Sequence, residues 1–315
     1  MKIIGFDDIV NLNISPELCY QWVSEMLMCK KSAILPAKIS MKPVGMDGVF
    51  LNCMPCVIPD FDCAGVKLVT RYPEREPSLD GQILLYRLGS GENIALMDGN
   101  WITTMRTGAV AAHSIIQFAV KDFKNIGMIG LGNTARATLK VLMSVCKNRK
   151  FNVRLLKYKN QHELFVEVFK EYENLNFIFC DAVEEVVESS EVIVSAVTVF
   201  QQDICEDKYF QEGCLLVPIH TRGFTNCDLF FDKVFADDVN HVKGFKNFDK
   251  FRSFAEVSQV LSGEKVGRRN SQERILVYNI GISLHDIYFA NRIEAMCKEE
   301  KCVSLNAPKA KFWLE

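Results

Sequence analysis

Apolar and polar positions alternate in two different ways along this chain. Between residues 124 and 238, short apolar runs typical of buried strands are followed by segments with helical periodicity. This alternation predicts an α/β fold, a Rossmann-type doubly wound parallel sheet. The pattern places strands at 126–130, 152–156, 176–180, 191–196, 214–219 and 233–236, and helices beginning near Asn133, Gln161 and Ala182.

The segments on either side follow other patterns. Ser15 and Pro16 are a favourable N-cap and first residue for a helix reaching about Met28. Extended runs separated by Gly, Pro and Asp turns follow at 38–42, 49–54, 66–70 and 82–88, and helical patterns are expected at 102–119, 254–263 and 275–296. We therefore expect an α+β substrate domain of residues 1–118 and 275–315, with a dinucleotide-binding domain of residues 119–274 inserted in it.

A glycine-containing turn joins the first parallel strand to its helix. The first glycine, Gly130, permits a tight turn, and the second, Gly132, lets the backbone approach a pyrophosphate. Asn133 and Thr134 open the helix, whose N-terminus favours phosphate, and Ala135 is small enough for close packing on the strand. We predict that these five residues bind a dinucleotide; the alternative is a tight turn without a ligand.

The end of the second parallel strand bears on the choice of cofactor. NAD enzymes normally carry Asp or Glu there to bind the ribose hydroxyls. This chain has Lys157-Tyr158-Lys159 instead. Lysines at this place would bind a 2′-phosphate through their positive charge, so we expect NADP(H) to be preferred over NAD(H). The alternative is that Lys157 and Lys159 are ordinary exposed charges.

Composition and charge exclude several classes of partner. The 315 residues carry a formal net charge of -2, which offers no basic surface for nucleic acid or anionic membranes. The sequence has no apolar run of about 18 residues, the length that could span a bilayer. We therefore expect a cytoplasmic protein with a small-molecule partner. The 12 cysteines are scattered, as reduced thiols would be. The closest pair, Cys53 and Cys56, lacks the further ligands of a zinc site, so we predict no metal.

Five stretches together carry a resemblance to a known family. They are Gly65–Lys67, Ile94–Gly99, Ile102–Ala109, Gly130–Gly132 and Gly281–Asp286. In this order they resemble the ornithine cyclodeaminase and mu-crystallin family. The resemblance implies a dinucleotide domain inserted in a substrate-binding and dimerisation domain, and a homodimer.

The resemblance also implies site residues. Lys67 and Arg106 match the cations that grip the α-carboxylate of an amino or imino acid, and Lys38 stands where the family usually has arginine. Thr107, next to Arg106, is expected to contact the cofactor. Arg106 lies near the start of the expected helix, where a cation is unfavourable, and this position independently indicates an anionic partner. The alternative is a solvated surface arginine.

A departure from the family pattern follows the fifth parallel strand. Aligning Asp228-Leu229 with the family's acidic-Leu pair puts Arg222 where ornithine-cyclising members carry an aspartate. Arginine cannot accept a proton from the substrate's distal amine, so ornithine cyclisation is disfavoured. Arg222 would suit a substrate with an anionic distal group, unless it faces solvent or cofactor phosphate. His220 is either an acid or base near neutral pH or a structural hydrogen-bond donor.

These inferences predict an enzyme, an NAD(P)H-dependent oxidoreductase acting on the C–N bond of an amino or imino acid. It would be a ketimine or imine reductase or an amino-acid dehydrogenase, with Lys67, Arg106 and Arg222 as catalytic residues and Lys67 also moving a proton. Three alternatives stay open: an ammonia lyase of the ornithine cyclodeaminase type, an amino-acid-condensing synthase of the opine or siderophore-precursor kind, and a non-enzymatic NADPH-binding protein.

Overall fold

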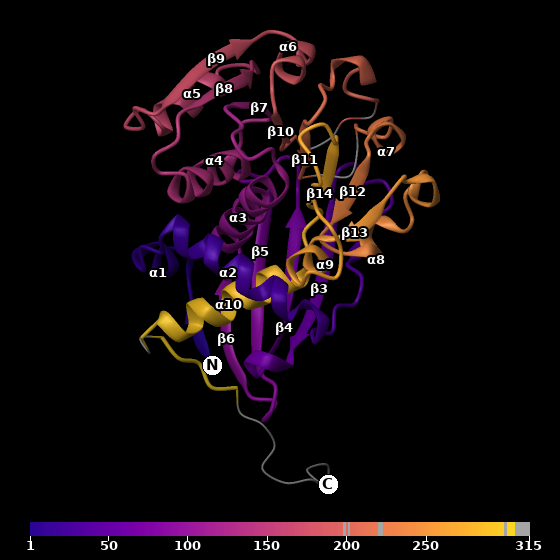
Figure 1. Cartoon of the computed structure of the whole chain (residues 1–315). Coiled ribbons are helices and arrows are strands. Elements are labelled where there is room, and N and C mark those ends of the chain that lie inside the picture. Colours follow the sequence, from indigo (N-terminus) through magenta and orange to yellow (C-terminus); the bar gives the residue numbers. More distant parts are fainter. Residues whose placement is uncertain (198–199, 201, 220–222, 299–300, 306–315) are drawn as a thin grey trace, which may run out of the picture.

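Two β-sheets organise the computed structural model, which describes residues 1–197, 200, 202–219, 223–298 and 301–305 (Figure 1). The first sheet has the order β1-β6-β5-β4-β3-β2; its strands are β1 (Lys2–Ile4), β2 (Ile39–Met41), β3 (Phe50–Ile58), β4 (Cys63–Arg71), β5 (Leu79–Arg87) and β6 (Asn93–Asp98). β1 pairs with β6 in parallel, whereas the other neighbours are antiparallel.

The second sheet is parallel throughout and has the order β13-β12-β14-β11-β10-β7-β8-β9. Its strands are β7 (Asn125–Ile129), β8 (Phe151–Leu156), β9 (Leu175–Cys180), β10 (Val192–Ser195), β11 (Leu215–Pro218), β12 (Lys233–Ala236), β13 (Phe254–Glu256) and β14 (Ile275–Tyr278). The chain leaves β7 toward β8 and β9 and then returns to the other side of β7 at β10. This reversal is the topological switch point at which doubly wound sheets bind ligands.

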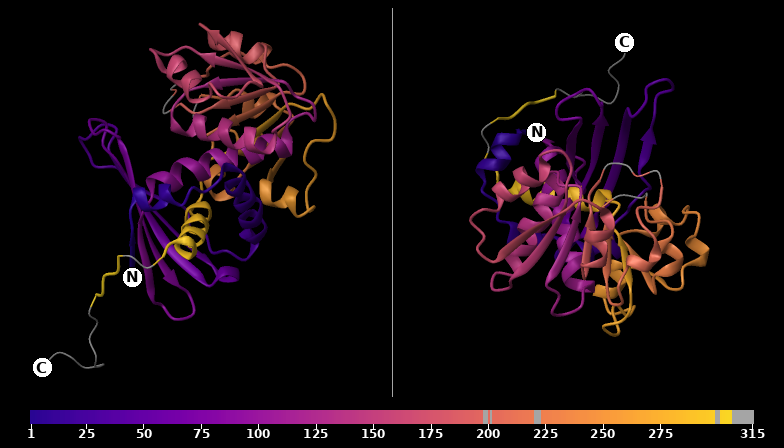
Figure 2. Two further views of the ribbon diagram at one scale, coloured as in Figure 1. Left: turned by 90° about the vertical axis from the view of Figure 1, so that its left-hand side faces the viewer. Right: turned by 90° about the horizontal axis from the view of Figure 1, so that it is seen from above.

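Helices fill the space between and around the sheets. They are α1 (Phe6–Asn11), α2 (Pro16–Met28), α3 (Asn100–Phe118), α4 (Asn133–Val145), α5 (Gln161–Val168), α6 (Val183–Glu188), α7 (Cys227–Phe230), α8 (Val239–Val242), α9 (Val257–Leu261) and α10 (Ser283–Met296). α3 lies at the junction and contacts β5 of the first sheet and β11 of the second, while α10 covers β3, β4 and β5 (Figure 2). One apolar core accordingly runs through both halves, from Ile83 through Ile115 to Val217.

Most of the predicted elements are confirmed. The six expected parallel strands and three helices each begin within two residues of the predicted position. The helix after Ser15 has the predicted cap, because the Ser15 hydroxyl accepts a hydrogen bond from the Leu18 N–H at 3.1 Å. Trp22 and Met26, on its inner side, are buried. The fold class inferred from the sequence, a Rossmann-type parallel sheet beside an α+β part, is confirmed.

Residues 275–296 do not form one long helix, and that prediction is wrong. Ile275–Tyr278 is a strand with all of its residues buried between β11 and β12, and the helix begins only at Ser283. A strand buried on both faces gives a continuous apolar run that periodicity cannot separate from a buried helix. The expected domain boundary after residue 274 therefore falls just before the last strand of the parallel sheet. Phe254–Glu256 is likewise a strand, and only Val257–Leu261 is helical.

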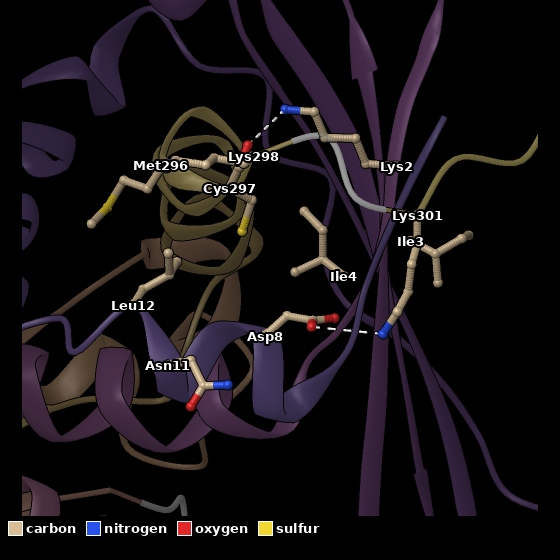
Figure 3. A pocket seen from close by; sticks show the side chains of 10 residues that line it. All are labelled: Lys2, Ile3, Ile4, Asp8, Asn11, Leu12, Met296, Cys297, Lys298 and Lys301. Carbon is tan, nitrogen blue, oxygen red and sulfur yellow. Dashed lines mark hydrogen bonds and ion pairs between the residues drawn. The ribbon is translucent and has the colours of Figure 1, made fainter.

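The C-terminal end of α10 is fastened to the start of the chain. The Lys2 ammonium donates to the carbonyls of Glu294 and Cys297 and forms an ion pair with the Glu294 carboxylate at 2.8 Å. Cations at a helix C-terminus satisfy its free carbonyls and its partial negative charge. Lys2 and Cys297 are among the residues that line a hollow of about 300 Å³ beside β1, and Asp8 and Lys301, which form an ion pair, also line it (Figure 3).

Candidate active site

The glycine turn has the geometry that its sequence predicts. Gly130 follows β7 with φ +82°, and a Cβ there would lie 2.8 Å from the Ala196 backbone, so a side chain does not fit. Gly132 precedes α4 and has no atom within 4 Å of an added Cβ, which leaves its backbone open to a ligand. Asn133 and Thr134 form the first turn of α4, and Ala135 is fully buried below them.

Arg136 also belongs to this turn, although no role was predicted for it from the sequence. Its Nε is buried without a hydrogen-bond partner among the described residues. The free N–H groups at the start of α4 provide partial positive charge beside the open Gly132 backbone, and the Arg136 guanidinium adds a full charge in the second turn of the helix. The chain's own residues therefore fit a dinucleotide pyrophosphate at this turn. An arginine four residues after the second glycine was the signal in the sequence.

Lys67 and Arg106 come together around a third residue, Asp286. Lys67 lies on β4, Arg106 on α3 and Asp286 on α10. Asp286 Oδ1 accepts hydrogen bonds from Lys67 Nζ at 2.7 Å and from Arg106 Nε at 2.9 Å. Because Arg106 is only 6% exposed, the alternative that it is a solvated surface arginine is wrong. The predicted pair is thus brought together at one buried point.

Burial changes the acid–base behaviour of this cluster. Loss of hydration lowers the pKa of Lys67 to about 8; the Asp286 carboxylate opposes this effect, while the Arg106 guanidinium adds to it. A lysine with such a pKa can hold or release a proton close to neutral pH. His285, beside Asp286 in the sequence, is completely buried, and burial holds its pKa well below the usual range, so it is neutral.

The loop between β14 and α10 shapes the space around Arg106. Gly281 has φ +85°, and a Cβ there would lie 2.6 Å from Arg106 Nη1, so only glycine leaves room for the guanidinium. The Gly281 N–H donates to Asp237 Oδ2 at 2.6 Å, which ties this loop to the end of β12. Burial raises the pKa of Asp237 to about 6, although the Gly281 hydrogen bond lowers it. Asp237 and Asp286 were not predicted as site residues.

Lys38 lies beside this cluster, in the loop before β2. It lines a narrow cavity with Met54, Asp238, His241 and Ser283 that holds about one water molecule. Burial and the neighbouring Arg106 guanidinium lower the pKa of Lys38. Burial and Lys38 in turn lower the pKa of His241. Lys38 therefore adds a third positive charge close to Lys67 and Arg106.

The remaining predicted residues that the structure describes have their contacts outside this cluster. Thr107 follows Arg106 on α3 and donates its hydroxyl to the Thr103 carbonyl at 2.6 Å. Lys157 is exposed after β8, where its Nζ pairs with Asp181 at 3.0 Å. Lys159, with φ +48°, lies over the Tyr158 ring. Arg222 and His220 lie outside the described residues.

Cys53 and Cys56 are free thiols on β3, where odd spacing places them on opposite faces of the sheet. Within the described ranges, no group of three or more His, Cys, Asp or Glu side chains is arranged to hold a metal ion. In the same ranges, no helix is long and apolar enough to cross a membrane.

Comparisons with known proteins agree with this arrangement. A Delta(1)-pyrroline-2-carboxylate reductase of Bacillus cereus is 21% identical, over 89% of this chain and 91% of its own length. The N-((2S)-2-amino-2-carboxyethyl)-L-glutamate dehydrogenase of Staphylococcus aureus is 27% identical, over 70% of this chain and 69% of its own. A structure of Thermococcus litoralis Delta(1)-pyrroline-2-carboxylate reductase with NADH and L-proline superimposes with a TM-score of 0.80 at 22% identity, covering 94% of this chain and 97% of that one.

A family model also matches nearly the whole chain. The model described as the ornithine cyclodeaminase/mu-crystallin family matches residues 9–301, and therefore includes the glycine turn, Lys67, Arg106 and Asp286. The chain belongs to the ornithine cyclodeaminase/mu-crystallin family.

Proposed function

We propose that this protein is an NAD(P)H-dependent oxidoreductase that reduces the C=N bond of an imino acid, or oxidises the corresponding amino acid in reverse. The observation that carries the proposal is the buried Lys67–Arg106 pair, in which Arg106 lies against the Gly281 loop that follows β14 of the parallel sheet. The same sheet presents the open glycine turn after β7. Relatives in the family named as pyrroline-2-carboxylate reductases support this reaction class.

The side chains divide the work of the reaction. Arg106 binds the substrate α-carboxylate with its terminal nitrogens, and Lys38 adds a second, more adaptable positive charge. This grip holds the carbon next to the carboxylate in place for reaction, which is the main catalytic contribution. The bound dihydronicotinamide supplies the hydride. Lys67 gives a proton to the imine nitrogen and is left as a neutral amine, which recovers its proton from water before the next turnover.

Gly130, Gly132, Asn133, Thr134 and Ala135 form the pyrophosphate site in this proposal, with Arg136 as an additional contact. Thr107 contacts the cofactor beside Arg106. Lys157 and Lys159 face the adenosine ribose, so NADP(H) is preferred and NAD(H) is the alternative. Two lysines and the lack of an acidic residue at the end of β8 support this preference.

Arg222 stays a prediction from the sequence alone. In the proposed enzyme it contacts an anionic distal group of the substrate. An exchange of Arg222 for Ala would then weaken turnover of a dicarboxylic imine far more than turnover of a monocarboxylic one. Equal losses on both substrates would remove this assignment.

The test is cofactor oxidation, measured by nicotinamide absorbance with NADPH or NADH and a cyclic ketimine carboxylate, pyruvate, 2-oxoglutarate or ornithine. We expect oxidation with the ketimine and a lower KM for NADPH. Ammonia release from ornithine without net cofactor change would instead establish a cyclodeaminase. A strict requirement for both an amino acid and an oxo acid would indicate a condensing enzyme, and cofactor binding without turnover would indicate a non-enzymatic protein.

We further propose that the protein is a homodimer formed through the first sheet. On β4, Lys67 and Val69 point toward the helices, whereas Leu68 points away and is 42% exposed. Its side of the sheet also has an apolar hollow that Val57, Val66 and Tyr86 line. Light scattering should give twice the chain mass, and an exchange of Leu68 for Glu should give monomer; a wild-type monomer would contradict the proposal.

A further inference from the structure

Asp286 connects side chains that are far apart in the sequence. One carboxylate oxygen, Oδ1, accepts from both Lys67 Nζ and Arg106 Nε, at 2.7 and 2.9 Å. The Asp286 side chain is 0% exposed, and those of Lys67 and Arg106 are 1% and 7% exposed. Without this carboxylate, two positive charges would lie side by side in a low-dielectric interior.

The way in which Arg106 is held matters for ligand binding. Asp286 accepts a hydrogen bond only from Nε of Arg106, and the described residues form no hydrogen bond to the two terminal nitrogens of the guanidinium. Gly281 leaves room for these nitrogens, since an added Cβ would lie 2.6 Å from one and 3.3 Å from the other. The fork that can bind a carboxylate with two parallel bonds is therefore oriented but unused.

Asp286 is also the anion that keeps the Lys67 ammonium charged. The charged groups that act on Lys67 are Asp286 on α10, Arg106 on α3 and Lys38 before β2. Burial, Arg106 and Lys38 all lower the pKa of Lys67, and Asp286 opposes them. His285, which is buried nearby and neutral, contributes no compensating charge. The protonated state of Lys67 near neutral pH therefore depends on this one carboxylate.

We propose that Asp286 is a positioning residue that fixes the Lys67 ammonium and the Arg106 guanidinium relative to each other and keeps Lys67 charged as a proton donor. This inference rests on the proposed imine reduction. In that reaction the imine carbon gains the hydride, the imine nitrogen gains the proton that Lys67 loses, and the nicotinamide is oxidised. Asp286 forms no bond to the substrate and is unchanged at the end.

The first test is the pH dependence of kcat/KM with the ketimine. In the wild-type enzyme the rate should fall as the pH rises through about 8, because Lys67 loses its proton there. In Asp286→Asn this alkaline limb should move down by about 1–3 pH units. In Asp286→Glu, which keeps the charge but shifts it, the limb should stay and the KM should rise by about tenfold or more. A limb unmoved in Asp286→Asn, or a KM unchanged in Asp286→Glu, would overturn the proposal.

Glu294→Gln is the matched control. It removes a carboxylate from the same helix and breaks an ion pair with Lys2, but at the opposite end of α10. It should leave both the pH profile and the KM unchanged. If it moves them as Asp286→Asn does, the effect belongs to the helix and the positioning role is wrong.

A second measurement separates this inference from the proposed reaction. With lysine labelled by ¹³C at Cε, the Lys67 resonance is identified by its loss in Lys67→Arg and titrated by NMR without any substrate. Its midpoint should lie near pH 8 in the wild type and lower in Asp286→Asn. Inactivity on every imino acid would end the proposed function alone. A Lys67 midpoint that ignores the loss of Asp286 would end this inference alone.

Discussion

Arg106 allows the sharpest prediction for a single residue. Its guanidinium is anchored through Nε, so exchange for Ala removes the ligand grip but leaves the glycine turn untouched. A charge-assisted hydrogen bond is worth about 1.5–3 kcal/mol, so kcat/KM for the imino acid should fall about 10- to 100-fold, mainly through KM. The Kd of NADPH, measured by nicotinamide fluorescence, should not change. The matched control is Arg87→Ala, which removes an exposed arginine at the far end of β5; an equal loss there would remove the assignment.

Lys157 and Asp181 give a prediction about cofactor choice. Asp181 pairs with Lys157 at 3.0 Å and would repel a 2′-phosphate, so Asp181→Asn should free Lys157 and lower the KM for NADPH relative to NADH. Both groups are exposed, so the change should be small, about two- to fivefold. Glu167→Gln, which breaks a similar exposed pair with Lys170, should have no effect. A shift toward NADH in Asp181→Asn would mean that Lys157 does not face the ribose.

Residue identity made part of the site predictable. Lys67 and Arg106 were found because their motifs resemble the family, and Gly130 and Gly132 because a strand and a helix flank them. Asp286 ends the Gly281–Asp286 motif, but no function was predicted for it. An acidic residue inside an apolar helix needs a buried cation, and that rule would have predicted a cationic partner for it. Which cation it binds is a tertiary property, because 219 residues separate it from Lys67.

The contact between α3 and α4 is a prediction at the scale of elements. Gly108 lies on α3 where a Cβ would meet Ala137 Cβ at 2.5 Å and the Thr138 nitrogen at 2.6 Å. Gly108→Ala gains about 1 kcal/mol in helix propensity but must push the helices apart, which costs about 1–3 kcal/mol in a packed core. We expect net destabilisation, measured as a lower Tm. Gly244→Ala, in open space, is the control; a higher Tm for Gly108→Ala would show that the helices give way freely.

The elements also show where periodicity stops being informative. Amphipathic helices such as α2 and α4 were found within a residue or two, because one face is polar. β14 was missed because all of its residues are buried, and a short, wholly apolar run fits either a strand or a helix. Only its insertion between β11 and β12, which are distant in the sequence, decides the matter.

At the scale of the whole molecule, Lys30 connects the part of the protein that contains the first sheet to the part that contains the parallel sheet. It lies in the 3-10 turn after α2 and pairs with Asp238 at 2.9 Å and Glu256 at 2.7 Å, both from the parallel-sheet part. The Glu256 side chain also accepts from the Val239 N–H, so the network includes the start of α8. Burial lowers the pKa of Lys30, but hydrogen bonds to the two carboxylates outweigh it and raise the pKa overall.

Lys30→Met should therefore loosen the connection between the two parts. It leaves two carboxylates together with little solvent, and removal of one partner from a buried pair costs about 3–5 kcal/mol. The control is Lys31→Met, at the next residue of the chain. It breaks an exposed ion pair with Glu264 and should cost at most about 1 kcal/mol. Denaturant unfolding measures the loss of stability in both variants.

The contribution of Lys30 to stability should not change between pH 7 and pH 9. Because the folded pKa of Lys30 lies above its ordinary value of 10.5, this contribution is fully present below that pH and is lost only as the pH rises through the raised value. The cost of Lys30→Met should thus be the same at pH 7 and pH 9, and a cost that disappears by pH 9 would show that Lys30 is not held charged between its two partners.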